Sequence, residues 1–334
     1  MKKRIIVIDQ VGFPMQKAML TESNKQIWTS VEKKYLNTKL KISRDNFNKT
    51  KKIIKNWRIK NKQDVPWLKL TDTQKYLHKY LNLRKIKRYI LQLLRYWKGE
   101  SIYLGNPFLI LKQFIFFRIR DFKVRYLFNY SKINEKEKFF YYPLHVEPEA
   151  SIMINGIRGL NQISLIQRIA MQLPFDMKLY VKEHPTMVGW RLIEDYKLLQ
   201  KMPNLKIINP NYNGKSLIIK SKGVFTISGT SGWEALLLKK PVFLIGTSFY
   251  RKLPMVKYIQ NIDNISNEIN WLKFEYQHSE HELIKFSHYI ISDAIDLPFE
   301  YFWGISDDQD VFKKLEEFKH ITFNLAKKIF MIIK

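Results

Sequence analysis

Residues 177 to 246 carry the clearest structural pattern of the chain; they begin MKLYVKEHPTMVGW (177–190) and end KGVFTISGTSGWEALLLKKPVFLIG (222–246). Two apolar, strand-like runs, 177–181 and 223–227, each lead into a polar loop. The second loop opens a predicted helix, 233–238, and a third strand, 241–246, follows it closely. This order predicts a βαβ unit with parallel strands and a right-handed crossover. Ligands of such sheets bind beyond the carboxyl ends of the strands, where both loops lie.

The same alternation of strands and helices extends on both sides of this unit. We expect strands at 139–144 and 205–208, and helices at 160–173, 191–201 and 216–220. Such an alternation is typical of an α/β fold with a doubly wound parallel sheet. Beyond residue 246 the pattern loosens, with a helix expected at 286–295 and one or two terminal helices within 308–333.

The first half of the chain has a different pattern. A short strand is expected at 4–8 and a loop at 9–14, followed by a mostly helical, basic region up to residue 130 and a polar linker at 131–138. We therefore predict three parts: a basic, helix-rich domain over 1–137, a Rossmann-like nucleotide-binding domain over 138–300, and C-terminal helices over 301–334 that pack back across both.

Positive charge is concentrated in one segment of the chain. Of a net charge of +28 over 334 residues, half falls within 41–100, where 18 Lys and Arg face only 4 Asp and Glu. Aromatic residues, among them Trp57, Tyr96 and Trp97, are interleaved with these cations. The mixture suits an anionic membrane surface or nucleic acid. The alternative is a solvated helical face whose aromatic side chains turn toward the core, with part of the charge reflecting a bias of the whole sequence toward Lys, Ile and Asn.

Composition also excludes several classes of protein. With no cysteine, the chain has no disulfide, no Cys-ligated zinc and no thiol nucleophile. No run of about 18 apolar residues exists, because Asn106, Lys112, Gln113 and Arg118 interrupt the closest one, 102–119. No signal peptide is evident. The sequence predicts a soluble or peripherally attached protein.

The loop after the strand at 223–227 is a candidate anion site. It consists of Ser228, Gly229, Thr230, Ser231 and Gly232. The glycines allow a ligand close to the backbone, and hydroxyls together with N–H groups at a helix start bind anions. Alternatively, the loop is a tight turn in which Ser231 caps the helix. Glu234 in the first helical turn would bind a ribose diol, or would only favour the helix dipole.

Two further strand ends carry candidate catalytic residues. His184 and Pro185 follow Lys182 after the strand at 177–181, and a histidine with a near-neutral pKa can donate to, or protonate, a leaving phosphate. Glu147 and Glu149 follow the strand at 139–144. Either carboxylate would deprotonate a sugar hydroxyl, or both would belong to a polar hinge.

Three segments together resemble a known family. They are YYPLHVEPEAS (141–151), LYVKEHP (179–185) and TISGTSGWEALLLKKPV (226–242), and they resemble the capsule polysaccharide biosynthesis family, best over residues 139–250. That family includes bacterial transferases of Kdo from CMP-Kdo, and it is similar in plan to bacterial sialyltransferases. The resemblance implies a GT-B fold, in which two Rossmann-like domains face each other and the second holds most of the donor nucleotide.

The resemblance also implies roles for individual residues. His184 and Pro185 match the His-Pro motif that contacts the donor phosphate, and Ser228, Thr230 and Ser231 match the serine motif on the same phosphate. Glu234 would hold the ribose, and Glu147 or Glu149 would be the general base. The resemblance implies catalysis without a metal, which agrees with the absence of an Asp-x-Asp motif from a suitable loop. The first half has too few strands for a full Rossmann-like domain, so we expect an acceptor-side domain that is either reduced and mostly helical or incomplete at its N-terminus.

The function expected from these features is that of a cytoplasmic glycosyltransferase of surface polysaccharide synthesis. It would transfer Kdo or a related ulosonic acid from a CMP-linked donor to a glycan or glycolipid acceptor, without a bound cofactor, and the basic first half would contact an anionic membrane. Nucleic acid is not the partner that we expect. Two alternatives stay open: an epimerase of the UDP-N-acetylglucosamine type, and a non-catalytic protein that uses its basic half on nucleic acid or anionic lipid.

Overall fold

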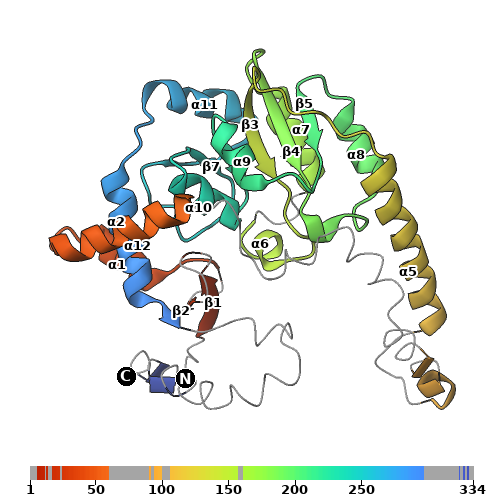
Figure 1. The fold of residues 1–334 in the computed structure, drawn as a ribbon, viewed down its shortest axis with the longest axis horizontal. Helices are drawn as coiled ribbons and strands as arrows, with labels where there is room; N and C mark the ends of the chain where they lie inside the picture. The colour runs from red at the N-terminus through yellow and green to blue at the C-terminus, as the bar shows by residue number, and fades with distance from the viewer. Residues whose placement is uncertain are drawn as a thin grey trace.

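A parallel β-sheet organises the molecule, whose computed structural model describes residues 6–59, 90–99, 106–156 and 161–296, except 12, 14–16, 23–24 and 92–93, and a few residues between 323 and 330 (Figure 1). The strands are β3 (Lys138–Pro143), β4 (Met177–Lys182), β5 (Leu205–Ile208), β6 (Val224–Thr226), β7 (Val242–Leu244) and β8 (Val256–Tyr258).

The strand order is β5-β4-β3-β6-β7-β8, and every neighbouring pair is parallel. The chain therefore adds β4 and β5 on one side of β3, then returns to add β6, β7 and β8 on the other side. This is the order of a doubly wound nucleotide-binding sheet, with its switch point between β3 and β6. The predicted α/β class and doubly wound sheet are confirmed.

Helices cover both faces of this sheet. One face is covered by α7 (Gln162–Met171), α8 (Ile193–Gln200) and α11 (Ile265–Phe274), and the other by α9 (Gly214–Lys220), α10 (Thr230–Leu237) and α12 (Glu280–Asp293). Successive side chains of β3 alternate between two hydrophobic clusters: Phe139 and Tyr141 belong to the cluster of α9, α10 and α12, whereas Phe140 and Tyr142 belong to that of α7, α8 and α11. Because both faces are buried, the strands read as continuous apolar runs.

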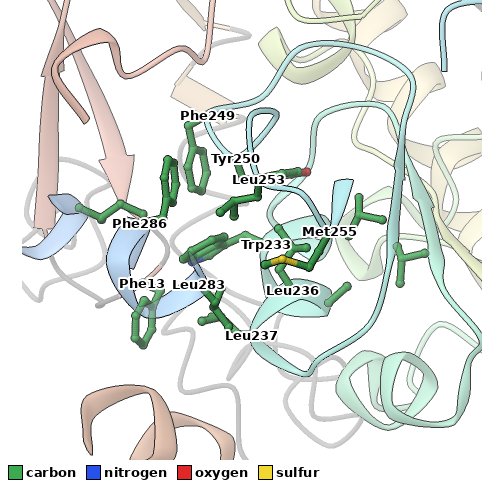
Figure 2. Close-up of a cluster of buried hydrophobic side chains, with 14 of the residues drawn as sticks. Phe13, Trp233, Leu236, Leu237, Phe249, Tyr250, Leu253, Met255, Leu283 and Phe286 are labelled. Atoms are coloured by element: carbon green, nitrogen blue, oxygen red, sulfur yellow. The ribbon is translucent and has the colours of Figure 1, made fainter. Parts of the chain in front are cut away.

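The N-terminal elements share a core with the second of these faces. Strands β1 (Val7–Val11), β2 (Lys17–Thr21) and β9 (Ile295–Asp296) form an antiparallel sheet, and helices α1 (Thr29–Leu36) and α2 (Arg44–Ile59) lie beside α12 (Figure 1). Figure 2 shows Phe13 and Phe286 on different sides of Trp233, with Leu283 in the same cluster. The first half is thus reduced and mostly helical where the structure describes it.

Some local predictions were wrong. The first strand extends over Val7–Val11, so Asp9 lies in a strand and not in a loop. Its carboxylate accepts a hydrogen bond from Trp28 Nε1 at 2.8 Å, and burial raises the pKa of Asp9. The segment 131–138 is not a free linker, because Glu137 accepts from Tyr180 and Lys206 of the sheet. Strand β8 and helix α11 were not predicted.

Helix α5 (Pro107–Phe122) and the π-helical turn η2 (Lys123–Leu127) precede β3. Figure 1 shows α5 at the right, running away from the sheet. No helix among the described residues is long and apolar enough to cross a membrane. Most of the predicted C-terminal helices over 301–334, and the basic region 60–89, lie outside the described residues, and the predicted domain boundaries stay a prediction.

Candidate active site

The predicted site residues lie at one edge of the parallel sheet, in three loops or in the strand and helix ends next to them. The loops follow β3, β4 and β6, which are neighbours in the order β4-β3-β6. The loop after β3 is therefore the middle one, and it lies at the switch point where ligands of doubly wound sheets bind.

The predicted loop after β6, residues 228–232, is called the Ser-Gly loop below. It is shorter than predicted, because helix α10 begins at Thr230 and not at Trp233. Gly229 is the N-cap residue and no side chain caps the helix, so the predicted alternative with Ser231 as the cap is wrong. Ser228 is buried, Thr230 is exposed and Ser231 is half-buried. The first turn of α10 thus presents a hydroxyl and uncapped N–H groups at the switch point, as an anion site requires.

His145 ties the loop after β3 to the Ser-Gly loop. Its Nε2 accepts a hydrogen bond from the Gly229 N–H at 3.1 Å and lies 3.2 Å from Thr226 Oγ1. The Gln162 side chain accepts from His145 N and donates to its carbonyl. Burial lowers the pKa of His145 to about 4, so the ring is neutral, and an accepting Nε2 places its hydrogen on Nδ1. His145 was not predicted as a site residue, although its position beside Glu147 at a strand end was a signal.

The two glycines of the loop are required by close neighbours. A Cβ at Gly229 would lie 2.8 Å from His145 Nε2, and one at Gly232 would overlap the Tyr250 hydroxyl. That hydroxyl donates to the Gly229 carbonyl at 2.8 Å. The glycines therefore let His145 and Tyr250 hold the loop from two sides.

His184 caps the short 3-10 helix Pro185–Met187 at the end of β4. Its Nδ1 lies 2.7 Å from Thr186 Oγ1 and accepts from the Thr186 N–H, so the hydrogen of the neutral ring lies on Nε2. Burial, and then the nearby Lys182 ammonium, lower the pKa of His184 to about 4. The pKa is therefore lower than the near-neutral value considered from the sequence, and at pH 7 the neutral ring can donate a hydrogen bond from Nε2.

Lys182 is the last residue of β4 and directly precedes the loop that carries His184. Its ammonium is buried and donates to the carbonyls of Pro210, at 3.2 Å, and Glu183, at 3.4 Å. Burial lowers the pKa of Lys182 to about 8, against the opposing charges of Glu183 and Glu234. Lys182 and half-buried Glu234 of α10 thus interact electrostatically, which relates the loop after β4 to the helix after β6.

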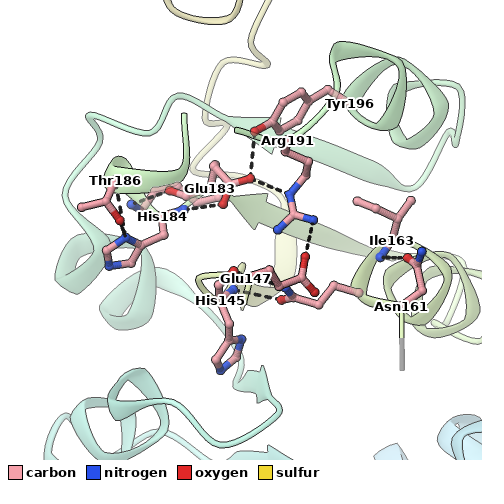
Figure 3. A network of polar contacts seen from close by, with 11 residues as sticks. His145, Glu147, Asn161, Ile163, Glu183, His184, Thr186, Arg191 and Tyr196 are labelled. Carbon is pink, nitrogen blue, oxygen red and sulfur yellow. Dashed lines mark hydrogen bonds and ion pairs between the residues drawn. The ribbon is translucent and has the colours of Figure 1, made fainter. Parts of the chain in front are cut away.

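A buried ionic network joins the loops after β3 and β4 (Figure 3). Glu183, 1% exposed, accepts from Arg191 Nε and from the Tyr196 hydroxyl, both at 2.8 Å, and from the His184 N–H at 2.8 Å. Arg191 Nη1 also donates to Glu147 Oε2 at 2.8 Å. No role was predicted for Glu183 or Arg191, although an acid directly after an apolar strand was a signal for a buried pair.

The two candidate bases differ in their surroundings. The Glu147 side chain is 30% exposed and is held by Arg191. Glu149 is exposed, and its carbonyl accepts from the N–H groups of Ile152 and Met153, the last two residues of α6 (Ala150–Met153). Within the described ranges, no group of three or more His, Asp and Glu side chains is placed to hold a metal ion.

A family comparison covers all three loops. The family model described as capsule polysaccharide biosynthesis protein matches residues 37–260, two thirds of the chain. The chain belongs to the capsule polysaccharide biosynthesis family. A comparison of this family member with curated proteins gives no match.

Several solved structures are similar to this member of the capsule biosynthesis family. KpsC of Thermosulfurimonas dismutans, a beta Kdo 2,7 transferase, is 13% identical with a TM-score of 0.48, over 85% of this chain and 68% of its own. The beta Kdo 2,4 transferase KpsC of the same organism is 17% identical with a TM-score of 0.33, over 56% of each chain. The UDP-GlcNAc 2-epimerase of Methanocaldococcus jannaschii is 17% identical with a TM-score of 0.36, over 54% of this chain and 48% of its own. The chain thus spans about half to two thirds of the length of these structures.

Proposed function

We propose that this protein is a glycosyltransferase that moves Kdo or a related ulosonic acid from a CMP-linked donor to a glycan or glycolipid acceptor during capsule synthesis. The observation that carries the proposal is the His145–Gly229 hydrogen bond, which joins two of the three candidate loops at the switch point of the sheet. All three loops fall within the region matched by the capsule family. The GT-B arrangement of two facing domains is part of the same proposal.

The donor phosphate would be held by neutral hydrogen-bond donors. Thr230, Ser231 and the uncapped first turn of α10 offer hydroxyl and N–H groups, and the helix dipole favours an anion there. His184 offers its Nε2–H. These donors would stabilise the charge that develops on the phosphate as the bond between phosphate oxygen and anomeric carbon breaks. Glu234, five residues into α10, would bind the ribose.

The acceptor hydroxyl would be deprotonated by a carboxylate of the loop after β3. Its oxygen forms a bond to the anomeric carbon, its proton passes to the carboxylate, and CMP leaves with the electron pair of the broken bond. Protonating Glu147 would remove one of the two carboxylates that neutralise the buried Arg191 guanidinium. We therefore assign the base to the more exposed Glu149, and to Glu147 the task of fixing the loop. No metal is assigned a role in this step.

The proposed location is the cytoplasm, at the inner face of the membrane where a lipid-linked acceptor would lie. An epimerase would act on UDP-N-acetylglucosamine without any acceptor. A non-catalytic protein would bind polyanions with a steep salt dependence and would not respond to nucleotide sugars.

Thermal denaturation with CMP-Kdo, CMP-sialic acid and UDP-sugars tests the proposal. We expect stabilisation by a CMP-sugar, and its loss in His184→Ala but not in His281→Ala, a matched change at an exposed histidine of α12. Glu149→Gln should keep donor binding and lose transfer. The proposal fails if no nucleotide sugar raises the melting temperature, or if His184→Ala responds as the parent does. Product formed from UDP-N-acetylglucosamine without acceptor would establish the epimerase instead.

A further inference from the structure

Helix α5 exposes an unusual amount of apolar side chain. Between residues 108 and 122, nine large apolar side chains are each 38–57% exposed. They are Phe108, Leu109, Ile110, Leu111, Phe114, Ile115, Phe116, Ile119 and Phe122. Apolar residues in one exposed cluster of this size mark a surface that binds another molecule or a membrane.

The distribution of these side chains around the helix indicates whether the surface suits a lipid or a protein partner. Phe108 to Leu111 occupy four consecutive positions. At 3.6 residues per turn, their side chains are distributed over about 300° around the helix axis. An amphipathic helix that docks on a protein buries one apolar stripe and leaves the rest polar. An apolar surface that surrounds the helix is matched by hydrocarbon, which can contact all sides.

The charges of α5 complement an anionic surface. Lys112, Arg118, Arg120 and Lys123 are exposed or half-buried, and three of these four lie near the end of the helix that joins the sheet domain. The acid in this segment, Asp121, is buried and paired with Arg125 at 2.7 Å. The charge that α5 and the start of η2 present to the surface is therefore positive, as headgroups of anionic lipids attract.

The cationic end of α5 is fixed to the loop that carries His184. Arg125 Nη2 donates to the Pro185 carbonyl at 3.4 Å, and Phe117 packs on Trp190 with ring centroids 4.7 Å apart. Gly189 lies against the Asp121 backbone so closely that a Cβ would be 2.7 Å from Asp121 Cβ, and its φ of +85° also favours glycine. These contacts hold the end of α5, the start of η2 and the His184 loop in one fixed arrangement.

We propose that α5 inserts its apolar N-terminal part into an anionic lipid leaflet, with the cations near its C-terminal end at the headgroups, and thereby places the His184 loop at the membrane surface. Its 16 residues measure about 24 Å, less than the ~30 Å of a bilayer hydrocarbon core, so the helix enters the membrane without crossing it. This lipid contact does not depend on the proposed transfer reaction.

Sedimentation with vesicles tests this inference. The full chain is mixed with phosphatidylcholine vesicles that contain about one third phosphatidylglycerol, and with vesicles of phosphatidylcholine alone. We expect the parent to sediment with the anionic vesicles, and Phe108→Glu/Phe116→Glu to bind at least tenfold more weakly. The matched control is Phe175→Glu/Phe274→Glu, which adds the same two negative charges at phenylalanines that are 102% and 81% exposed. The control should bind as the parent does.

Three results would overturn the inference. The first is a parent that stays in solution with anionic vesicles. The second is equal loss of binding in the α5 variant and the matched control, which would show that net charge alone drives binding. In the third, light scattering shows that the parent is a dimer and the α5 variant a monomer, and neither binds lipid. That result would assign the surface to a second copy of the chain. Unfolding curves confirm that each variant is folded, and donor-induced stabilisation, measured separately, reports on the proposed function.

Discussion

Replacing Arg191 with methionine should destabilise the fold strongly. The guanidinium lies between two carboxylates: its side chain is 7% exposed, and that of Glu183 is 1% exposed. Arg191→Met keeps most of the apolar stem but leaves Glu183 without a cation. Tyr196 and the His184 N–H would still donate to Glu183, because burial and then the Glu183 charge raise the pKa of Tyr196 and keep it protonated.

The expected size follows from the burial of the pair. Removing one partner of a buried ion pair costs about 3–5 kcal/mol, since a charge stays buried without compensation. Lys138→Met is the contrasting variant, because the Lys138–Asp176 pair, at 2.9 Å, is about 60% exposed on both sides. Exposed pairs contribute roughly 0–1 kcal/mol. The two variants should therefore differ by several kcal/mol in free energy of unfolding.

A double variant tests the reasoning itself. If the cost of Arg191→Met comes from the unpaired Glu183 charge, then adding Glu183→Gln should restore part of the lost stability, because the amide carries no charge. Urea denaturation followed by circular dichroism measures all four proteins of this cycle. The unpaired Glu183 charge is not the cause if the double variant is less stable than Arg191→Met alone, or if the single variant loses less than about 1 kcal/mol of stability.

Three further predictions concern the loops. Gly229→Ala, whose Cβ would lie 2.8 Å from His145 Nε2, should weaken donor binding about tenfold by calorimetry, and an unchanged affinity would contradict the role of that contact. Because its pKa is lowered to about 4, His184 should stay neutral, with its hydrogen on Nε2, down to about pH 5.5. Nitrogen-detected NMR, with the His184 signal assigned by comparison with His184→Gln, measures this, and titration near pH 6.5 would contradict it. For Lys182, whose pKa falls from 10.5 to about 8 on folding, the unfolded chain binds more protons between these values, so stability should rise with pH there. Relative to Lys182→Met, the parent should gain about 2 kcal/mol between pH 7.5 and 9.5, and parallel pH profiles would show that the ammonium is not buried.

The amino-acid sequence was enough to predict the class of fold and the edge of the sheet where the candidate site lies. Apolar runs separated by helical periods predicted the alternation, and the range of β5 agreed with the structure residue for residue. Since parallel strands end at the same edge, the polar residues after β3, β4 and β6 had to gather there. The start of α10 was misplaced by three residues, because Thr230 and Ser231 are as suited to a turn as to a first helical turn.

Which of these residues meet, and in what protonation state, depends on contacts between segments far apart in the chain. His145 and Gly229 are 84 residues apart, and Arg191 and Glu147 are 44 apart, so no local pattern pairs them. Likewise, the contact of Gly189 with Asp121 fixes α5 to the His-Pro loop across a long separation. Protonation states also depend on distant segments. Burial lowers the pKa of His184 and of Lys182, and this burial results from packing between distant segments rather than from neighbours in the chain.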